Sequence, residues 1–224
     1  MPVRVPDFYP ERINLRVPGM AYVGEHHASG PIRLQLGAPV ALNATGILNA
    51  QSIAAAGASV TFDPAYTPAA MGPYGRNVSV ALSGAGTPTI DVRGRDYLGQ
   101  RMRETLTGAG AAAVLGLKAF KYIDSVTWGL VAGTTLNVGW GNAFGFQFKA
   151  RAMTTELKNG VISANAGTFV PGLAQGTAPT AINADVRGTY LPVTVLPNGT
   201  NIFEVFYLPE DTYNNMHGSA QFYS

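Results

Sequence analysis

Apolar and polar residues alternate along much of the chain with a period of two, which is typical of strands that bury one face. Where this pattern begins, Ile32, Leu34 and Leu36 alternate with Arg33 and Gln35. Glycine-rich turns separate a series of similar short segments. The segments predicted to form strands are 32–36, 58–62, 77–83, 88–94, 101–108, 112–120, 122–129, 135–140, 144–150, 161–165, 188–195 and 201–208. This spacing predicts an all-β fold, either an antiparallel sandwich or a jelly-roll-like domain.

The pattern divides the chain into an extended N-terminal arm and a β-rich domain. The arm comprises 1–30 and the domain 31–224, with the clearest strand pattern in 77–150. A helix is predicted only at 49–56, where alanines follow Asn49, a residue type that caps helix N-termini. Very little other helix is expected.

Aromatic residues cluster in two of the predicted strands, where we interpret them as core packing between sheets. They are Phe144, Phe146, Phe148, Phe203, Phe206 and Tyr207. The Pro-Asn-Gly-Thr sequence at 197–200 precedes the second of these strands and predicts a hairpin turn.

The two ends of the chain hold aromatic residues with little local sequence to bury them. Prolines at positions 2, 6, 10 and 18 exclude a regular helix from the start of the arm and favour an extended path. An aromatic side chain that docks into a pocket gains a large contact area for few ordered torsions. At the two ends, the residues predicted to contact a neighbouring subunit are Phe8, Tyr9, Arg12, Arg16, Phe222 and Tyr223.

The stretch 88–108 is predicted to form two strands around the sequence Asp-Tyr-Leu-Gly-Gln at 96–100. Apolar residues alternate here with charged ones, so one face is predicted to be mostly apolar. The other face holds the four arginines Arg93, Arg95, Arg101 and Arg103. Asp91 and Asp96 are near enough in sequence to pair with some of them. We interpret this face as a solvated or subunit-facing surface, because a nucleic-acid site would need a longer basic run or interleaved aromatics.

Composition supports contact with other protein. Charged residues make up 12% of the sequence and hydrophobic residues 46%, which is little charge for the surface of a free monomer. The formal net charge of +2 is too small to indicate a polyanion, so we expect no nucleic-acid partner. The sequence shows no signal-peptide order and no run of ~18 apolar residues, so we expect no membrane partner and assembly in a cytoplasm.

The sequence offers little to support catalysis. It contains no Gly-x-Ser-x-Gly, His-Glu-x-x-His, EF-hand or dinucleotide-binding motif, and the glycine-rich 108–116 lacks the ending of a phosphate loop. There is no cysteine, and His26, His27 and His217 have no spacing that suits a shared metal ion. We therefore predict no catalytic, cofactor-binding or metal-binding residues, and a protein that is not an enzyme.

Within 90–129, a strand precedes a Gly-x-Asp-x-x-Gly turn, Glu-Thr-Leu-Thr-Gly, a glycine- and alanine-rich turn, and Lys-Ala-Phe before the next strand. The residues of this pattern are Gly94, Asp96, Gly99, Glu104, Thr105, Thr107, Gly108, Lys118, Ala119 and Phe120. The pattern resembles one found in virion structural proteins of tailed bacteriophages, and 185–209 is similar to the closing part of the same proteins.

This resemblance implies a capsid cement or decoration protein, which binds the outside of a phage head and stabilises the shell. The implied partners are the major capsid protein and copies of the chain itself, as a homotrimer or homodimer. The implied location is the capsid surface of a virion assembled in the bacterial host cytoplasm. Two alternatives remain open at this point: a head-fibre, tail or adaptor protein of the virion, and a glycan-binding module.

Overall fold

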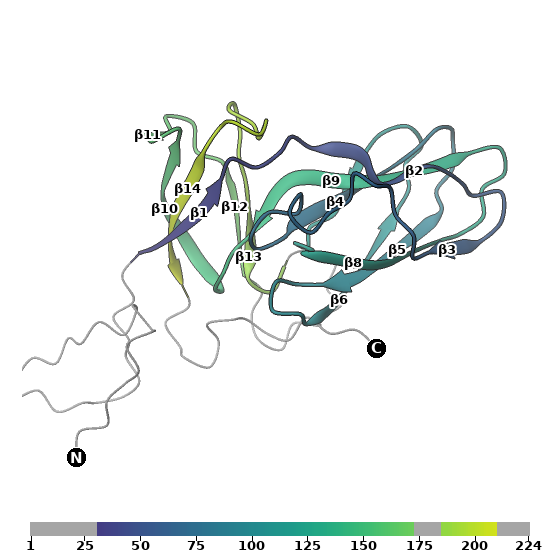
Figure 1. The fold of residues 1–224 in the computed structure, drawn as a ribbon, viewed down its shortest axis with the longest axis horizontal. Helices are drawn as coiled ribbons and strands as arrows, with labels where there is room; N and C mark the ends of the chain where they lie inside the picture. Colours follow the sequence, from purple (N-terminus) through teal and green to yellow (C-terminus); the bar gives the residue numbers. More distant parts are fainter. Residues whose placement is uncertain (1–30, 173–184, 210–224) are drawn as a thin grey trace, which may run out of the picture.

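The computed structural model describes residues 31–172 and 185–209, and every regular element within these two ranges is a β-strand (Figure 1). The strands are β1 (Ile32–Gly37), β2 (Asn43–Ser52), β3 (Gly57–Ser59), β4 (Arg76–Leu82), β5 (Thr89–Arg95), β6 (Arg101–Thr107), β7 (Val114–Leu115), β8 (Tyr122–Trp128), β9 (Thr135–Gly145), β10 (Ala150–Lys158), β11 (Val161–Ile162), β12 (Thr168–Pro171), β13 (Gly188–Leu191) and β14 (Phe203–Pro209). The predicted all-β class is confirmed. The predicted arm, 1–30, lies outside the described residues.

The strands form three antiparallel sheets. The first sheet has the order β1-β14-β10-β11, and the third has the order β3-β8-β5-β6. The second has the order β12-β13-β9-β4-β7, with β2 also paired to β9. β9, with eleven residues, is the longest described strand, and in Figure 1 it extends from the part of the molecule near β13 to the part that contains β2 and β4.

Two hydrophobic clusters lie between these sheets. The first cluster fills the space between the second and third sheets and includes Val78, Val80, Ile90, Val92, Val126, Val138 and Trp140. The second cluster lies between the first sheet and the other end of the second, and includes Leu34, Phe144, Tyr190, Val205 and Tyr207. Sheets packed face to face over a shared apolar layer form the predicted sandwich. β9 contributes to both clusters, with Trp140 in the first and Phe144 in the second.

The predicted aromatic core is confirmed for four of its six residues. Those that are fully buried are Phe144, Phe146, Phe203 and Tyr207. Phe148 and Phe206 are half-buried. In β14 the buried and half-buried residues alternate along the whole strand, as the period of two requires.

The predicted helix at 49–56 is wrong, because its first residues continue β2. The register of β2 with β9 shifts around Ala50, which has a φ of 50° and donates its N–H to Asn137 Oδ1 at 2.8 Å. Ile53, just beyond β2, is fully buried in the first cluster. Pairing with β9 and burial of Ile53 therefore outweigh the helix propensity of the alanines.

Several predicted strand boundaries are also wrong, and the predicted strands 58–62, 161–165 and 188–195 end early, at Ser59, Ile162 and Leu191. Of 112–120, only β7 and the single bridge residue Phe120 pair with β4, because the amides of Leu117 and Ala119 between them donate to side-chain carboxylates. The predicted strands 135–140 and 144–150 do not exist as such, because β9 continues through Gly141 to its end at Gly145. A glycine at 141 allows this, since a Cβ there would lie only 2.5 Å from Asn77 Oδ1.

The sequence at 197–200 forms a turn, but the turn does not connect a hairpin. Asn198 Oδ1 accepts hydrogen bonds from the N–H groups of Thr200 and Asn201 at 2.9 and 2.7 Å, and Gly199 has a φ of +84°. The strands before and after it, β13 and β14, belong to different sheets. Turn residues determine a local chain reversal but not which strands pair.

Candidate functional site

The hairpin of β5 and β6 carries four arginines on one face, as the alternation predicts. Its strands pair without a register shift from Thr89 opposite Thr107 to Arg95 opposite Arg101. The inward-facing residues Ile90, Val92, Met102, Glu104 and Leu106 are buried. The arginines, by contrast, are half-buried or exposed, so they form the outer face of the third sheet.

Asp91 lies between two of these arginines and fixes their guanidinium groups. Its Oδ2 accepts a hydrogen bond from Arg93 Nε at 3.0 Å, and its Oδ1 accepts one from Arg103 Nε at 2.5 Å. Thr105 Oγ1 also donates to Oδ1, at 3.1 Å. Burial alone would raise the pKa of Asp91, but these three hydrogen bonds outweigh it and lower the pKa below its ordinary value. Asp91 is therefore ionised at neutral pH.

The other two arginines differ in their surroundings. Arg95 Nη2 lies 3.0 Å from Asp124 Oδ1, and the Arg95 guanidinium lies 5.2 Å from the ring centre of Tyr122. Arg101 is exposed, and its side chain has no ion-pair or hydrogen-bond partner within the part of the chain that the structure describes. Four arginines and the two aspartates that pair with them leave this face with two net positive charges.

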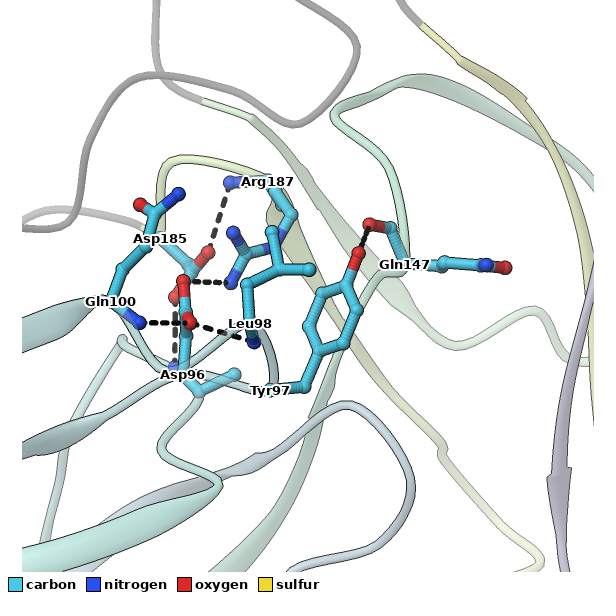
Figure 2. A network of polar contacts seen from close by, with 8 residues as sticks. Asp96, Tyr97, Leu98, Gln100, Gln147, Asp185 and Arg187 are labelled. Atoms are coloured by element: carbon cyan, nitrogen blue, oxygen red, sulfur yellow. Dashed lines mark hydrogen bonds and ion pairs between the residues drawn. The ribbon is translucent and has the colours of Figure 1, made fainter. Parts of the chain in front are cut away.

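Asp96, at the tip of the hairpin, points inward and organises the turn (Figure 2). Its Oδ1 accepts hydrogen bonds from the N–H groups of Leu98 and Gln100 at 2.8 and 2.9 Å. Its Oδ2 forms an ion pair with Arg187 Nη2 at 2.9 Å, and both side chains are buried. The prediction that Asp96 pairs with an arginine of the hairpin is therefore wrong. Its partner is Arg187, because the turn directs the carboxylate away from the outer face.

Arg187 connects the hairpin to a pair of tyrosines. Its guanidinium lies 4.9 Å from the ring centre of Tyr97, and Tyr74 meets Tyr97 edge-on with ring centres 5.1 Å apart. The Tyr97 hydroxyl donates to the backbone carbonyl of Gln147 (Figure 2). Burial raises the pKa of Tyr97 to about 12, with Asp96 adding to the rise and Arg187 opposing it. Tyr97 is therefore a neutral hydrogen-bond donor at physiological pH.

Asp185 joins the same region from the segment before β13. Its Oδ1 accepts a hydrogen bond from the Arg187 N–H at 2.9 Å, and its Oδ2 accepts one from the Ala119 N–H at 3.1 Å. The loop after β7 is thus attached to the chain segment that supplies Arg187. Ala119 is 66 positions from Asp185 in the sequence, so this hydrogen bond is a tertiary contact.

Glu104 fixes the same loop from the inner face of β6. Its Oε1 accepts a hydrogen bond from the Leu117 N–H at 2.6 Å, and its Oε2 accepts one from the Lys118 N–H at 3.4 Å. Burial raises the pKa of Glu104 to about 7, although these amides oppose the rise. The pKa of Lys118 is lowered, chiefly by burial, against the attraction of Glu104 and Asp185.

We call these five buried charged residues the polar joint: Asp96, Glu104, Lys118, Asp185 and Arg187. They come from two segments of the sequence, and all five occur in the stretches that carry the resemblance described above. The joint connects the arginine hairpin to the loop after β7 and to the start of β13. A raised carboxyl pKa is common in catalytic sites, but here both Glu104 oxygens are already bound by backbone amides.

Two further charged sites are buried, and sequence reasoning missed both. Arg76 is fully buried and donates to the carbonyls of Gly141 at 2.8 Å, Val40 at 2.9 Å and Ala70 at 3.2 Å. Burial lowers the pKa of Arg76 to about 9. Its guanidinium also lies 4.9 Å from the ring centre of Phe144. Arg76 therefore fixes two loops against β9.

The second missed site is a buried ion pair on β10. Glu156 Oε1 and Lys158 Nζ are 2.7 Å apart, and both side chains are buried. Glu156 Oε2 accepts a hydrogen bond from the Gly167 N–H at 2.5 Å, and Lys158 Nζ donates to Asn165 O at 3.2 Å. The only signal in the sequence is the spacing of two, which places both side chains on one face of β10.

The structure places the four predicted arginines on one face, but it does not test the other predicted partner-binding residues. Those residues lie outside the described ranges: Phe8, Tyr9, Arg12, Arg16, Phe222 and Tyr223. The three histidines also lie outside them. Within 31–172 and 185–209, the acidic residues form no group of three or more that could hold a metal ion. No helix in these ranges is long and apolar enough to cross a membrane.

Comparison of the chain with protein-family models, with curated proteins and with solved structures finds no match.

Proposed function

We propose that this chain is a non-enzymatic structural protein of a virion, a cement or decoration protein that binds the outside of a tailed-phage capsid and stabilises the shell. The observation that carries the proposal is the division of charge within the hairpin. The buried charged residues are bound to backbone groups and to each other, whereas the arginines lie on an outer face with two net positive charges.

The polar joint supports this interpretation of the resemblance. Asp96 and Glu104 belong to the first resembling stretch, and Arg187 belongs to the second. In the fold these stretches contact each other directly, through the Asp96–Arg187 ion pair and through the Asp185 hydrogen bond to the Ala119 N–H. The two stretches that carry the resemblance therefore pack together as one unit, which holds the arginine hairpin in place. A pattern of this kind suits a structural protein, because the buried carboxylates of the joint are bound by backbone amides and by Arg187.

The partners in this proposal are the major capsid protein and further copies of the chain, as a homotrimer or homodimer, on the capsid surface. The arginine face would meet an acidic surface of the shell, where electrostatic complementarity governs register and association rate. Arg101 is the best candidate for such a contact, because its guanidinium is exposed and has no partner in the described part of the chain. Nucleic acid and membrane are not partners in this proposal.

The test is cryo-electron microscopy of virions that contain the chain, combined with particles that lack it. We expect density for the β-sandwich at regular positions on the outer capsid surface, and a lower tolerance of heat and osmotic shock in the particles without it. Density restricted to fibres or to the tail would replace this proposal with the head-fibre, tail or adaptor function. Binding on a glycan array by a chain absent from capsids would favour the glycan-binding module.

A matched pair of variants tests the arginine face directly. Arg101→Glu should reduce occupancy on capsids assembled without the chain, because it reverses an exposed charge on the proposed contact face. Arg33→Glu is the control, since Arg33 is also exposed but lies on β1 in the first sheet, where it pairs with Glu204. Equal occupancy of the two variants would show that the arginine face does not bind the shell.

A further inference from the structure

Among the strands that the structure describes, β6 is an unusually long outermost strand. It is the outermost strand of the third sheet, and within the described residues it pairs only with β5. The pairing covers all seven residues without a bulge. The other outermost strands that the structure describes are short, with two to four residues in β3, β7, β11 and β12, or carry register shifts, as β1 and β2 do. Short or bulged edges discourage further pairing, and β6 lacks both features.

The backbone groups that face outward from β6 follow from its register. The N–H of Gly108 donates to Pro88 O at 2.9 Å, and the N–H of Asp96 donates to Gln100 O at 3.0 Å, so both pairs face each other across the hairpin. Because hydrogen-bonded and non-hydrogen-bonded pairs alternate in an antiparallel ladder, the intervening odd-numbered residues of β6 direct their backbone groups away from β5. We call them the outer-edge residues: Arg101, Arg103, Thr105 and Thr107.

The charge beside this edge selects against a second copy of the same strand. The side chains of Arg101 and Arg103 lie on the outer face next to the edge. If two copies of β6 paired about Arg103, arginines of both copies would lie side by side, and like charges in such positions are destabilising. A strand with carboxylates at the corresponding positions would instead neutralise the excess positive charge of this face.

The inner side of the same edge is apolar. The loop after β7 lies against Glu104, because Leu117 donates its N–H to Oε1 at 2.6 Å and a Cβ at Gly116 would overlap Oε2. Leu115 and Leu117, on either side of that glycine, keep 51% and 41% of their surface exposed. Two large apolar side chains, one at the end of β7 and one in the loop after it, are thus exposed near the residues that contact Glu104.

We propose that β6 accepts a β-strand from a partner protein, and that this strand alternates acidic and apolar residues. The acidic residues would lie beside Arg101 and Arg103 on the outer face, and the apolar residues would contact Leu115 and Leu117 on the inner side. Strand addition gives affinity through main-chain hydrogen bonds and specificity through alternate side chains. The inference depends on the geometry of this edge, and it holds wherever in a virion, or outside one, the chain acts.

The first test uses a synthetic peptide of alternating aspartate and valine, as long as β6, with the full chain labelled for NMR. The peptide should slow hydrogen exchange of the outer-edge amides and leave the amides of Met102, Glu104 and Leu106 unchanged, because those already bond to β5. The control peptide has lysine in place of aspartate and should not bind. Equal binding of both peptides, or protection at another edge, would overturn the proposal.

Variants at Thr105 isolate the backbone contribution. Thr105→Pro removes one outward N–H without removing a bond of the β5 ladder, and should weaken aspartate–valine peptide binding about tenfold. Thr105→Val is the matched control, because it loses the same hydroxyl but keeps the N–H, and should bind like the wild type. Arg101→Glu provides a test that needs no backbone change, and should reverse the preference between the two peptides. Unchanged binding by Thr105→Pro, or an unchanged preference in Arg101→Glu, would refute strand addition at β6.

Discussion

Replacing Arg187 with leucine should lower the free energy of unfolding by about 3 kcal/mol. The substitution removes the ion-pair partner of the Asp96 carboxylate, which the structure buries completely. Removing one partner of a buried ion pair costs about 3–5 kcal/mol in general. We take the lower end of this range because Asp96 keeps its hydrogen bonds from the N–H groups of Leu98 and Gln100, at 2.8 and 2.9 Å.

Urea titration and thermal unfolding of the full chain measure this effect. A loss of about 3 kcal/mol corresponds to a fall of roughly 6–12 °C in the midpoint of thermal unfolding for a chain of this size. The matched control is Arg33→Leu, which breaks the exposed pair with Glu204 and should cost no more than about 1 kcal/mol. A loss in Arg187→Leu no larger than that of the control would refute the role assigned to the polar joint.

A double-mutant cycle separates the ion pair from the turn. Asp96→Asn removes the negative charge but keeps an Oδ1 acceptor for the two amides of the turn. Because the double variant has no unpaired buried charge, its loss should be smaller than the sum of the two single losses by about 1–3 kcal/mol. Strictly additive losses would show that Asp96 and Arg187 stabilise the fold independently.

Three further predictions concern Glu104, Arg76 and the N-terminal arm. Burial raises the pKa of Glu104 from 4.5 to about 7, so the folded chain binds this proton more tightly than the unfolded chain. The free energy of unfolding of the wild type should therefore fall as the pH rises from 4.5 to 7. In urea titrations at several pH values, Glu104→Gln should show a weaker fall over this range. The same pH dependence in both proteins would contradict the raised pKa of Glu104. Arg76→Met should cost about 3 kcal/mol in thermal unfolding, because it leaves the buried carbonyl of Gly141 without its donor; an unchanged midpoint would count against it. Deleting residues 2–20 should leave the midpoint unchanged yet weaken association with capsids by about 2–5 kcal/mol in a binding titration, if its two aromatic residues are anchors; equal occupancy would exclude the arm from assembly.

The arginine hairpin could be predicted from the sequence because its determinants are local. The period of two assigns Ile90 and Met102 to the inner face, and the Asp-Tyr-Leu-Gly-Gln sequence supplies a turn that needs a glycine at 99, where φ is +80°. When two successive strands form a hairpin, the turn between them determines their register, and the register determines the face on which each side chain lies.

The polar joint could not be predicted in the same way, because its contacts join residues that are distant in the sequence. Asp96 and Arg187 are 91 positions apart, and no periodicity links them. Arg76 illustrates a second limit, since pattern reasoning places charged residues at the surface. Its burial becomes intelligible only when the carbonyls of three separate segments are seen around it.

The length of β9 restricts which insertions and deletions the chain can tolerate. Leu136, Val138, Trp140 and Phe144 are all buried and all lie on the same side of the strand by parity, yet they supply two different clusters. Inserting or deleting one residue between Trp140 and Phe144 would turn one cluster's share of β9 toward the opposite face. Inserting two would restore the facing but move the second cluster by about 6.6 Å along the strand. Natural variation in length should therefore accumulate in exposed connecting segments such as the turn at 159–160, and this stretch of β9 should keep a constant number of residues across functional variants.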